Sequence, residues 1–503
     1  MVGMTPLFSL FFLSLYLIRT VRNLFYHLAW WEIKEYRFDR MKVHITETYQ
    51  GRQWVLGFYS SIKWVLLILY LLPLSHVFGG YVNQVLILVY LIEGLHNIYE
   101  LSQGWKMPPL RLRIGVIGIV TVGVLTSVIS WPLPISEKLL LVDKAIGLTV
   151  TALIFLSNLI FSIHRENILK KARLKISQYN GLQVVGITGS YGKTSTKEFI
   201  AQILATKHHI VKTLASQNSD IGIAERILKA DLNGVEIFVC EMAAYHPGEI
   251  ASSCSLFGDK IKVGVLTGIN EQHQSLFGSI ETTERSKYEL IQAVHEKGTA
   301  LFNGENKRAR EMSKWSHPQK LSCIVVNKTH ILELPSQVHG AHFKENLALA
   351  SAAAQSFGMM SKEIKDAIKT IVLPERTMDT IKEGGVTIVN DTFNANPDAV
   401  YAGLRHISRI PGKKVLVMQP LIELGKYADE VHMKIGEMAG EICDQIVLTN
   451  RNFNASFIRG LKQVPGGMKK LRIGRAPNHI KEGVILFEGK EAEKYLNKVE
   501  SVL

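Results

Sequence analysis

The chain has few cysteines and a shortage of acidic residues. Its 503 residues include four cysteines, none in a Cys-x-x-Cys pair, and 44 acidic residues against 58 lysines and arginines. Scattered single cysteines exclude a disulfide framework and a cysteine-based zinc site, and they favour a reducing compartment. No internal repeat or low-complexity tract stands out, and the length suits roughly three domains. The net charge of +14 favours anionic partners such as nucleic acid, anionic lipid or acidic small molecules.

Long apolar runs are confined to about the first 165 residues. No basic segment precedes the first run, which argues against a cleaved signal peptide. The sequence therefore predicts a helical transmembrane domain over residues 1–165, with membrane lipid as a partner. Five stretches are long and apolar enough to span a bilayer: residues 4–18, 54–74, 81–99, 112–131 and 139–163.

Lysine and arginine are concentrated in alternate loops of this region. The segments after the first, third and fifth stretches are basic, whereas residues 73–84 and 130–138 are nearly free of Lys and Arg. Under the positive-inside rule, the N-terminus lies outside and the chain beyond residue 164 lies in the cytoplasm. The predicted localisation is thus a multi-pass protein of the cytoplasmic membrane. Lysines and arginines at the membrane edge explain much of the excess of basic over acidic residues, so no nucleic-acid partner is expected.

The segment GITGSYGKTST, residues 186–196, lies between an apolar β-branched run and an amphipathic helical pattern. In a strand-to-helix turn of this kind, backbone N–H groups and a helix N-terminus point at one anion site. The adjacent lysine and hydroxyl groups favour ATP phosphates with Mg²⁺ over a turn that glycine serves only for packing. Ile187 stands where the strict P-loop pattern has glycine. The predicted ATP-binding residues here are Gly189, Ser190, Gly192, Lys193, Thr194 and Ser195.

Three residues beyond the loop are candidates for the same site. The next predicted strand ends at Glu241, which a parallel sheet would bring to the edge that carries the phosphate loop. Thr194 and Glu241 supply oxygen ligands of the type that Mg²⁺ prefers. His273 lies in a later loop, and Lys287 lies on the buried side of a predicted helix. Taken alone, Glu241 could equally be a solvated strand end, and the other two are more often ordinary surface residues.

From about residue 183 to its end, the chain resembles the Mur ligases, the ATP-dependent amide-forming enzymes of peptidoglycan precursor synthesis. The resemblance is to the branch that adds D-alanyl-D-alanine to the muramoyl tripeptide (the MurF type). It also explains Ile187, because Thr-Gly-x-x-Gly-Lys-Thr is the family's own form of the loop. The motifs occur in the family's order: GITGSYGKTS, EMAAYHPGEI, HQSLFGSIETTERSKYELI, LFNGEN, HGAHFKENLALASAA, PERT, NDTFNANPDAV and LIELG.

The resemblance implies a fold. An ATP-binding α/β central domain is expected over residues 166–375, and a C-terminal Rossmann-like domain over residues 376–503. Family members begin with a soluble domain that grips uridine diphosphate. Only about twenty residues separate the last predicted span from the phosphate loop, too few for such a domain. The membrane domain is therefore expected to replace it.

The resemblance also implies roles for single residues. His273 and a carbamoylated Lys287 would hold a second Mg²⁺, beside the first at Thr194 and Glu241. Asn346 would contact the nucleotide, Arg376 the ATP phosphates and Asp391 the ribose. The implied catalytic residues are Lys193, His273, Lys287 and Arg376. The implied substrate-binding residues are Asn394, Asn396, Glu423 and Gly425.

Two departures from the family pattern leave the amine substrate open. Gln419-Pro420 replaces the usual Gly-Asp before the ELG motif, and residues 488–491 read EGKE where the family has a KGSR-like element. The predicted function is an ATP-dependent ligase acting through an acyl phosphate in peptidoglycan or cell-envelope precursor synthesis. Its partners would be a carboxylate acceptor, which a lipid carrier could present, and an amino acid or dipeptide amine.

Three alternatives stay open at this stage. The first is a membrane-bound ATPase or switch protein, which would leave NDTFNAN and LIELG without a role. The second is a ligase similar to poly-amino-acid synthetases, with an acceptor outside peptidoglycan. The third is a catalytically silent relative that serves as a scaffold, although every nucleotide and metal position is present.

Overall fold

The computed structural model describes residues 5–71, 75–102, 107–108, 111–133, 135–214, 217–315, 321–330, 343–477 and 482–500. The chain divides into two compact units, Met1–His164 and Arg165–Leu503. Small parts of the first two predicted spans, residues 4 and 72–74, lie outside the described residues. The predicted boundary at residue 375 falls inside the second unit and stays a prediction.

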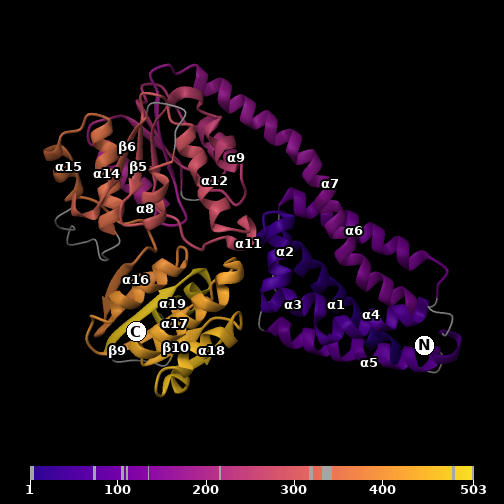
Figure 1. Ribbon diagram of the computed structural model, residues 1–503. Helices are drawn as coiled ribbons and strands as arrows, with labels where there is room; N and C mark the ends of the chain where they lie inside the picture. The colour runs from indigo at the N-terminus through magenta and orange to yellow at the C-terminus, as the bar shows by residue number, and fades with distance from the viewer. Residues whose placement is uncertain are drawn as a thin grey trace. The chain divides into compact units, whose positions relative to one another are not determined.

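The first unit is built from helices that run beside one another (Figure 1). Five helical segments in the described part of the chain are long and apolar enough to cross a membrane, by length and composition only. The first of them continues well past the predicted end at residue 18, where the buried residues Leu24, Leu28 and Trp31 recur at helical spacing. The helices are α1 (Pro6–Ile33), α2 (Phe38–Glu47), α3 (Tyr49–Leu56), α4 (Phe58–Leu71), α5 (Ser75–Ser102), α6 (Leu112–Ser130) and α7 (Ile135–Ser177).

A buried set of four charged side chains joins four of these helices. Arg19 on α1 contacts Glu93 on α5 at 2.5 Å, and it also pairs with Asp143 on α7. Lys63 on α4 lies 2.8 Å from Glu93 and 3.4 Å from Asp143. Apolar side chains surround the set, among them Tyr90, which is fully buried. We call Arg19, Lys63, Glu93 and Asp143 the buried ion network.

The second unit contains two six-stranded sheets, each flanked by helices. The first sheet has the strand order β2-β3-β1-β4-β5-β6, and all its pairs are parallel. Its strands are β1 (Gln183–Thr188), β2 (Ile210–Lys212), β3 (Ile237–Glu241), β4 (Ile261–Leu266), β5 (Thr299–Asn303) and β6 (Ser322–Val326). Its helices are α8 (Lys193–Leu204), α9 (Asp220–Lys229), α10 (Glu249–Cys254), α11 (Gln274–Phe277), α12 (Ile280–Gln292), α13 (Lys307–Met312), α14 (Phe343–Ser356) and α15 (Ser361–Ile368).

The second sheet has the order β11-β10-β9-β12-β8-β7, with only the β7–β8 pair antiparallel. The strands are β7 (Asp379–Glu383), β8 (Val386–Asp391), β9 (Lys413–Met418), β10 (Gln445–Leu448), β11 (Leu471–Ile473) and β12 (Gly483–Glu488). The helices are α16 (Pro397–Ile407), α17 (Ala428–Ile442), α18 (Asn454–Lys462) and α19 (Glu493–Glu500).

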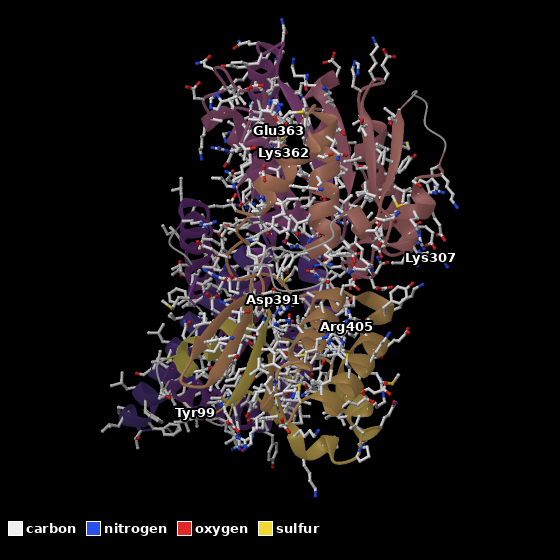
Figure 2. All side chains as sticks on the ribbon, turned by 90° about the vertical axis from the view of Figure 1, so that its left-hand side faces the viewer. Tyr99, Lys307, Lys362, Glu363, Asp391 and Arg405 are labelled. Carbon is white, nitrogen blue, oxygen red and sulfur yellow. The ribbon has the colours of Figure 1, made fainter. Side chains whose placement is uncertain are left out.

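The central strands of both sheets are buried apolar runs, as a sheet covered on both faces requires. Ligands of open parallel sheets bind beyond the carboxyl ends of the strands, where the chain leaves in opposite directions. In the first sheet this point lies after β1, which has β3 on one side and β4 on the other. Asp391 marks the corresponding end of the second sheet, on the side of the first (Figure 2).

Candidate functional site: a phosphate loop at the edge of the first sheet

The loop between β1 and α8 requires its two glycines. Gly189 has φ 149° and Gly192 has φ 73°, both in the region that disfavours side chains. A Cβ atom at position 189 would lie 2.1 Å from Thr267 Oγ1, and one at position 192 would lie 2.8 Å from Asn346 Oδ1. The loop is therefore a close-fitted cradle that begins α8, and the predicted nucleotide residue Asn346 lies directly against it.

The cradle holds polar groups suited to an anion. Lys193 Nζ donates to the carbonyl oxygens of Gly189, at 2.7 Å, and Ser190, at 3.0 Å, so the ammonium group lies over the loop. Burial lowers the pKa of Lys193, opposed by the negative charge of Glu241. Ser190 is buried, and its Oγ has no hydrogen-bond partner among the described residues. The N-terminus of α8, where Thr194 and Ser195 lie in the first turn, adds free backbone N–H groups.

Thr194 and Glu241 meet as predicted. Thr194 Oγ1 donates to Glu241 Oε1 at 3.2 Å, and Asn218 Nδ2 donates to the same oxygen at 3.1 Å. Sequence analysis did not identify Lys197, which is fully buried with Nζ 3.6 Å from Glu241 Oε2. Its position one turn after Lys193 was the available signal. Lys197 thus places a positive charge beside a buried carboxylate at the loop.

A second cluster lies around His273, which follows β4 and has a positive φ of 63°. Its Nδ1 lies 2.6 Å from Glu423 Oε2, and its ring centroid is 4.7 Å from that of Tyr245. A carboxylate partner fixes the proton on Nδ1 and leaves Nε2 as a lone-pair donor, the arrangement typical of metal-binding histidines. Burial lowers the pKa of His273, partly offset by Glu423, so the ring is neutral at neutral pH.

Glu423, which contacts His273, lies in the segment that follows strand β9 of the second sheet. The segment that follows β9 docks on the segment that follows β4: Ser275 N donates to Glu423 O at 3.2 Å, and Gly425 N donates to Ser275 Oγ at 2.8 Å. Asn270 Nδ2 adds a hydrogen bond of 2.7 Å to Asp398 on α16. Two residues predicted only as substrate ligands, Glu423 and Gly425, thus also join the two sheets at the site.

Lys287 is buried on α12, as its predicted position on the inner helix face requires. Its Nζ donates to Ala244 O at 3.2 Å. Burial lowers the pKa of Lys287 well below its usual value, and the charge of Lys193 adds to the effect. A lowered pKa favours the uncharged form of the amine, which is the nucleophilic form.

Arg376 and Asp391 make their contacts away from the phosphate loop. Arg376 is half exposed and pairs with Glu493 at 2.9 Å, so it would have to exchange partners to reach ATP. Asp391 is buried in register with Glu488 on the neighbouring strand β12. Burial raises the pKa of both carboxyl groups; the charge of Asp379 adds to the shift at Asp391, and the charge of Asp391 adds to the shift at Glu488. Glu488 is the first residue of the EGKE departure, which places an acid next to the predicted ribose ligand.

The remaining predicted substrate residues differ in what they do locally. Asn396 caps α16 by accepting from Ala399 N at 3.1 Å, whereas Asn394 is exposed. Among the described residues there is no group of three His, Cys, Asp or Glu side chains placed to hold a metal ion. Magnesium at this edge would therefore take Thr194 and Glu241 together with phosphate and water oxygens, which is the usual way that proteins bind it.

Comparison with known proteins identifies the two sheets. Residues 187–330 match the Mur ligase middle domain, and residues 376–478 match the Mur ligase, glutamate ligase domain. UDP-N-acetylmuramoyl-tripeptide–D-alanyl-D-alanine ligase of Mycobacterium tuberculosis is 30% identical over 290 residues, 52% of this chain and 56% of the relative. The same ligase of Escherichia coli is 27% identical over 51% of this chain and 62% of the relative. The chain thus spans little more than half the length of these curated relatives.

Two crystal structures share the fold of this unit. MurF from Acinetobacter baumannii superposes with a TM-score of 0.59 at 22% identity, covering 67% of this chain and 80% of that one. MurF from Thermotoga maritima in complex with ADP gives 0.57 at 24% identity, covering 67% and 83%.

The predicted localisation is wrong on these comparisons. The relatives are named as UDP-N-acetylmuramoyl-tripeptide–D-alanyl-D-alanine ligases, and none of their names refers to a membrane. A multi-pass protein with its N-terminus outside the cytoplasmic membrane is therefore not supported. The prediction used helix length and apolar composition, which do not distinguish a helix facing lipid from one covered by protein. What stands is an N-terminal helical unit followed by two regions that match the Mur ligase middle domain and the Mur ligase, glutamate ligase domain.

Proposed function

We propose that the Arg165–Leu503 unit catalyses the ATP-dependent joining of a carboxylate to an amine in peptidoglycan precursor synthesis. The observation that carries this proposal is the phosphate cradle with its Thr194–Glu241 pair, next to which Glu423 from the second sheet meets His273. The similarity to ligases named for UDP-N-acetylmuramoyl-tripeptide and D-alanyl-D-alanine supports these two molecules as acceptor and amine. A lipid-linked acceptor has no support in the comparisons and is not included.

The first step activates the acceptor. A carboxylate is unreactive toward amines at neutral pH, so an acceptor oxygen attacks the γ-phosphorus of ATP, the bond to the β-phosphate oxygen breaks, and ADP leaves. Transfer of this kind requires positioning and neutralisation of charge more than covalent help. Lys193 and the amides of the cradle would hold the β- and γ-phosphates, because they surround the only anion cradle at the carboxyl end of β1 among the described residues. Bound Mg²⁺ would neutralise phosphate charge, with Thr194 and Glu241 as its protein ligands.

The second step forms the amide. The amine attacks the carbonyl carbon of the acyl phosphate, a tetrahedral intermediate forms, and phosphate leaves as the nitrogen loses its proton. The segment from Glu423 to Gly425 borders His273 and is well placed to position the amine or the acceptor. Exposed Asn394 and capping Asn396 would line the same end of the second sheet. We retain Asn346, Arg376 and Asp391 as nucleotide ligands, of which Asn346 has direct support from its contact with Gly192.

Lys287 is proposed to act as a carbamate. Its neutral amine can add to CO₂, forming an N–C bond and releasing one proton, which converts a buried base into a carboxylate. That carboxylate and His273 would face a second Mg²⁺. The low pKa caused by burial supports this, because only the unprotonated amine reacts.

Release of phosphate by the full-length protein tests the proposal. With ATP and Mg²⁺, we expect release and an amide product of the correct mass only when UDP-N-acetylmuramoyl-tripeptide and D-alanyl-D-alanine are both present. Equal release without acceptor or amine would indicate an ATPase or switch. Turnover with other acceptors alone would indicate a ligase outside peptidoglycan synthesis, and no turnover with any acceptor would indicate a scaffold.

A further inference from the structure

The helical unit contains a cavity that the proposed ligase chemistry does not use. Its volume is about 1060 Å³, and residues of α1, α2, α3, α4, α5 and α7, all between positions 19 and 156, line it. Sites for small organic molecules usually measure roughly 300–1,000 Å³, so this cavity can take a molecule of nucleotide or short-lipid size. It lies wholly within the Met1–His164 unit.

The charges that line the cavity do not cancel. The buried ion network contributes two cations and two carboxylates, and Arg22 pairs with Glu100 at 2.5 Å. Lys144 is the remaining cation: no ion pair involves it within the described part of the chain. Its Nζ lies 3.5 Å from Ser60 O and 4.4 Å from the centre of the Trp64 ring. The cavity therefore holds one positive charge more than it has carboxylates.

A second cation of the lining has an unused donor. Arg19 is 6% exposed, and its Nη1 has no hydrogen-bond partner among the described residues, although Nε and Nη2 are paired with carboxylates. A buried guanidinium N–H without a partner is costly, and an anionic oxygen is its strongest acceptor. Arg19 on α1 and Lys144 on α7 both line the cavity, and their charges interact, so two cations from different helices lie near one another there.

The walls of the cavity suit an apolar or planar group. Trp54, Trp64 and Tyr26 lie in the lining, and the Tyr26 and Trp54 rings are 5.9 Å apart in an edge-to-face contact. Aromatic walls beside buried cations match a ligand with an uncharged body and one charged end.

We propose that this cavity is a binding site for an organic phosphate, whose phosphate group contacts Lys144 and Arg19 while Trp54 and Trp64 cover its apolar or aromatic body. The shared chemistry admits an alkyl phosphate or a nucleoside phosphate. The proposal is independent of the ligase activity.

Tryptophan fluorescence and calorimetry on the full-length protein test the proposal, with a nonionic detergent in every sample because many apolar side chains are exposed. The probes are decyl phosphate, uridine diphosphate, inorganic phosphate and decanol. We expect saturable binding of decyl phosphate or uridine diphosphate, at least about tenfold tighter than that of inorganic phosphate and decanol. Which of the two binds identifies the source of the ligand. Absence of saturation with both, or equal affinity for decanol or inorganic phosphate, would overturn the proposal.

Variants locate the site. Lys144→Gln should weaken binding of the organic phosphate by about tenfold, and Lys144→Arg should retain most of it, because the charge is kept. Lys170→Gln is the matched control, since Lys170 is exposed on the same helix and does not line the cavity. Unchanged affinity in Lys144→Gln would place the ligand elsewhere. If that variant does not fold, loss of binding in Trp54→Ala with an unchanged melting curve carries the test, and unchanged binding in it would refute the site.

Discussion

Both units of the molecule bury charged side chains, but they satisfy them in different ways. In the helical unit, Arg19 and Lys63 each contact two carboxylates, so the charges of the ion network are balanced. In the described part of the α/β unit, Lys197 is paired with Glu241, but Lys193 and Lys287 donate to backbone carbonyl oxygens, and burial lowers the pKa of both. In the first arrangement every cation has carboxylate partners. In the second, Lys193 and Lys287 have none among the described residues, and an anionic ligand could supply the missing negative charge.

This difference distinguishes buried charges that stabilise the fold from buried charges that serve binding or catalysis. Burying a charge costs several kcal/mol, which a closed set of partners offsets and an open set does not. An open set persists where binding or catalysis requires it, and perturbed pKa values in a cleft indicate such places. Lys144 is the exception in the described part of the helical unit, and it lines the cavity that we propose as a binding site.

Breaking the closed network should have the largest effect on stability. Arg19→Met leaves two buried carboxylates with one cation, and we expect a loss of about 3–5 kcal/mol in the free energy of unfolding of the helical unit. Urea unfolding followed by circular dichroism, with limited proteolysis to separate the two units, measures it. The double variant Arg19→Met/Asp143→Leu restores the balance of charge and should regain most of the loss. Equal instability of both variants would contradict the explanation by charge.

Lys193→Ala should act on turnover and leave stability unchanged. Removing a charge that contacts the transferring phosphate should lower phosphate release by about 100-fold or more, whereas the loop depends on its glycines and should remain folded. The matched control is Lys207→Ala, whose exposed ammonium pairs with Glu363 at 2.9 Å on a surface helix. A rate above about one tenth of the wild type would remove the phosphate-loop assignment.

Lys287→Ala should be nearly inactive and recover in part with added acetate, because a small carboxylate replaces the carbamate. Intact-protein mass under bicarbonate is the independent measurement, with an increase of one CO₂ expected only when Lys287 is present. Lys362→Ala, at an exposed position, is the control. An unmodified mass together with no recovery by acetate would exclude the carbamate.

The smallest effect concerns pH. Burial raises the pKa of Asp391 and Glu488, so the folded protein binds more protons than the unfolded chain above pH 4 or so. Stability contributed by this pair is present in acid and is lost as pH rises through the folded pKa values. Glu488→Gln should therefore raise the Tm at pH 8 by roughly 2 °C and have less effect at pH 5. Glu441→Gln, exposed on α17, should show no such difference, and an equal shift at both pH values would refute the pair.

Several features followed from local sequence. The strand-to-helix turn of residues 186–196 could be predicted because glycine spacing and the change of apolar period are local properties. The same holds for the buried strand that ends at Glu241. Lys197 could not be predicted as a partner of Glu241, because the two residues lie on different elements and only the packing of α8 on β3 brings them together.

In the helical unit, apolar composition predicts the helices but not their surroundings. Apolar runs determined where long helices form, but they did not determine what covers those helices, and the localisation drawn from them was wrong. The charged residues within those runs say more about how the helices pack. The buried ion network forms only when α1, α4, α5 and α7 assemble.

By itself, the sequence determined the order of helices and strands, the phosphate loop and the Mur ligase motifs, since each depends on neighbouring residues. Only the tertiary structure decided that Glu423 meets His273, that Glu488 lies beside Asp391, and that Lys144 has no carboxylate partner in the described part of the chain. Those outcomes depend on residues far apart in the chain, and the free energy of a buried charge is set by all the groups around it.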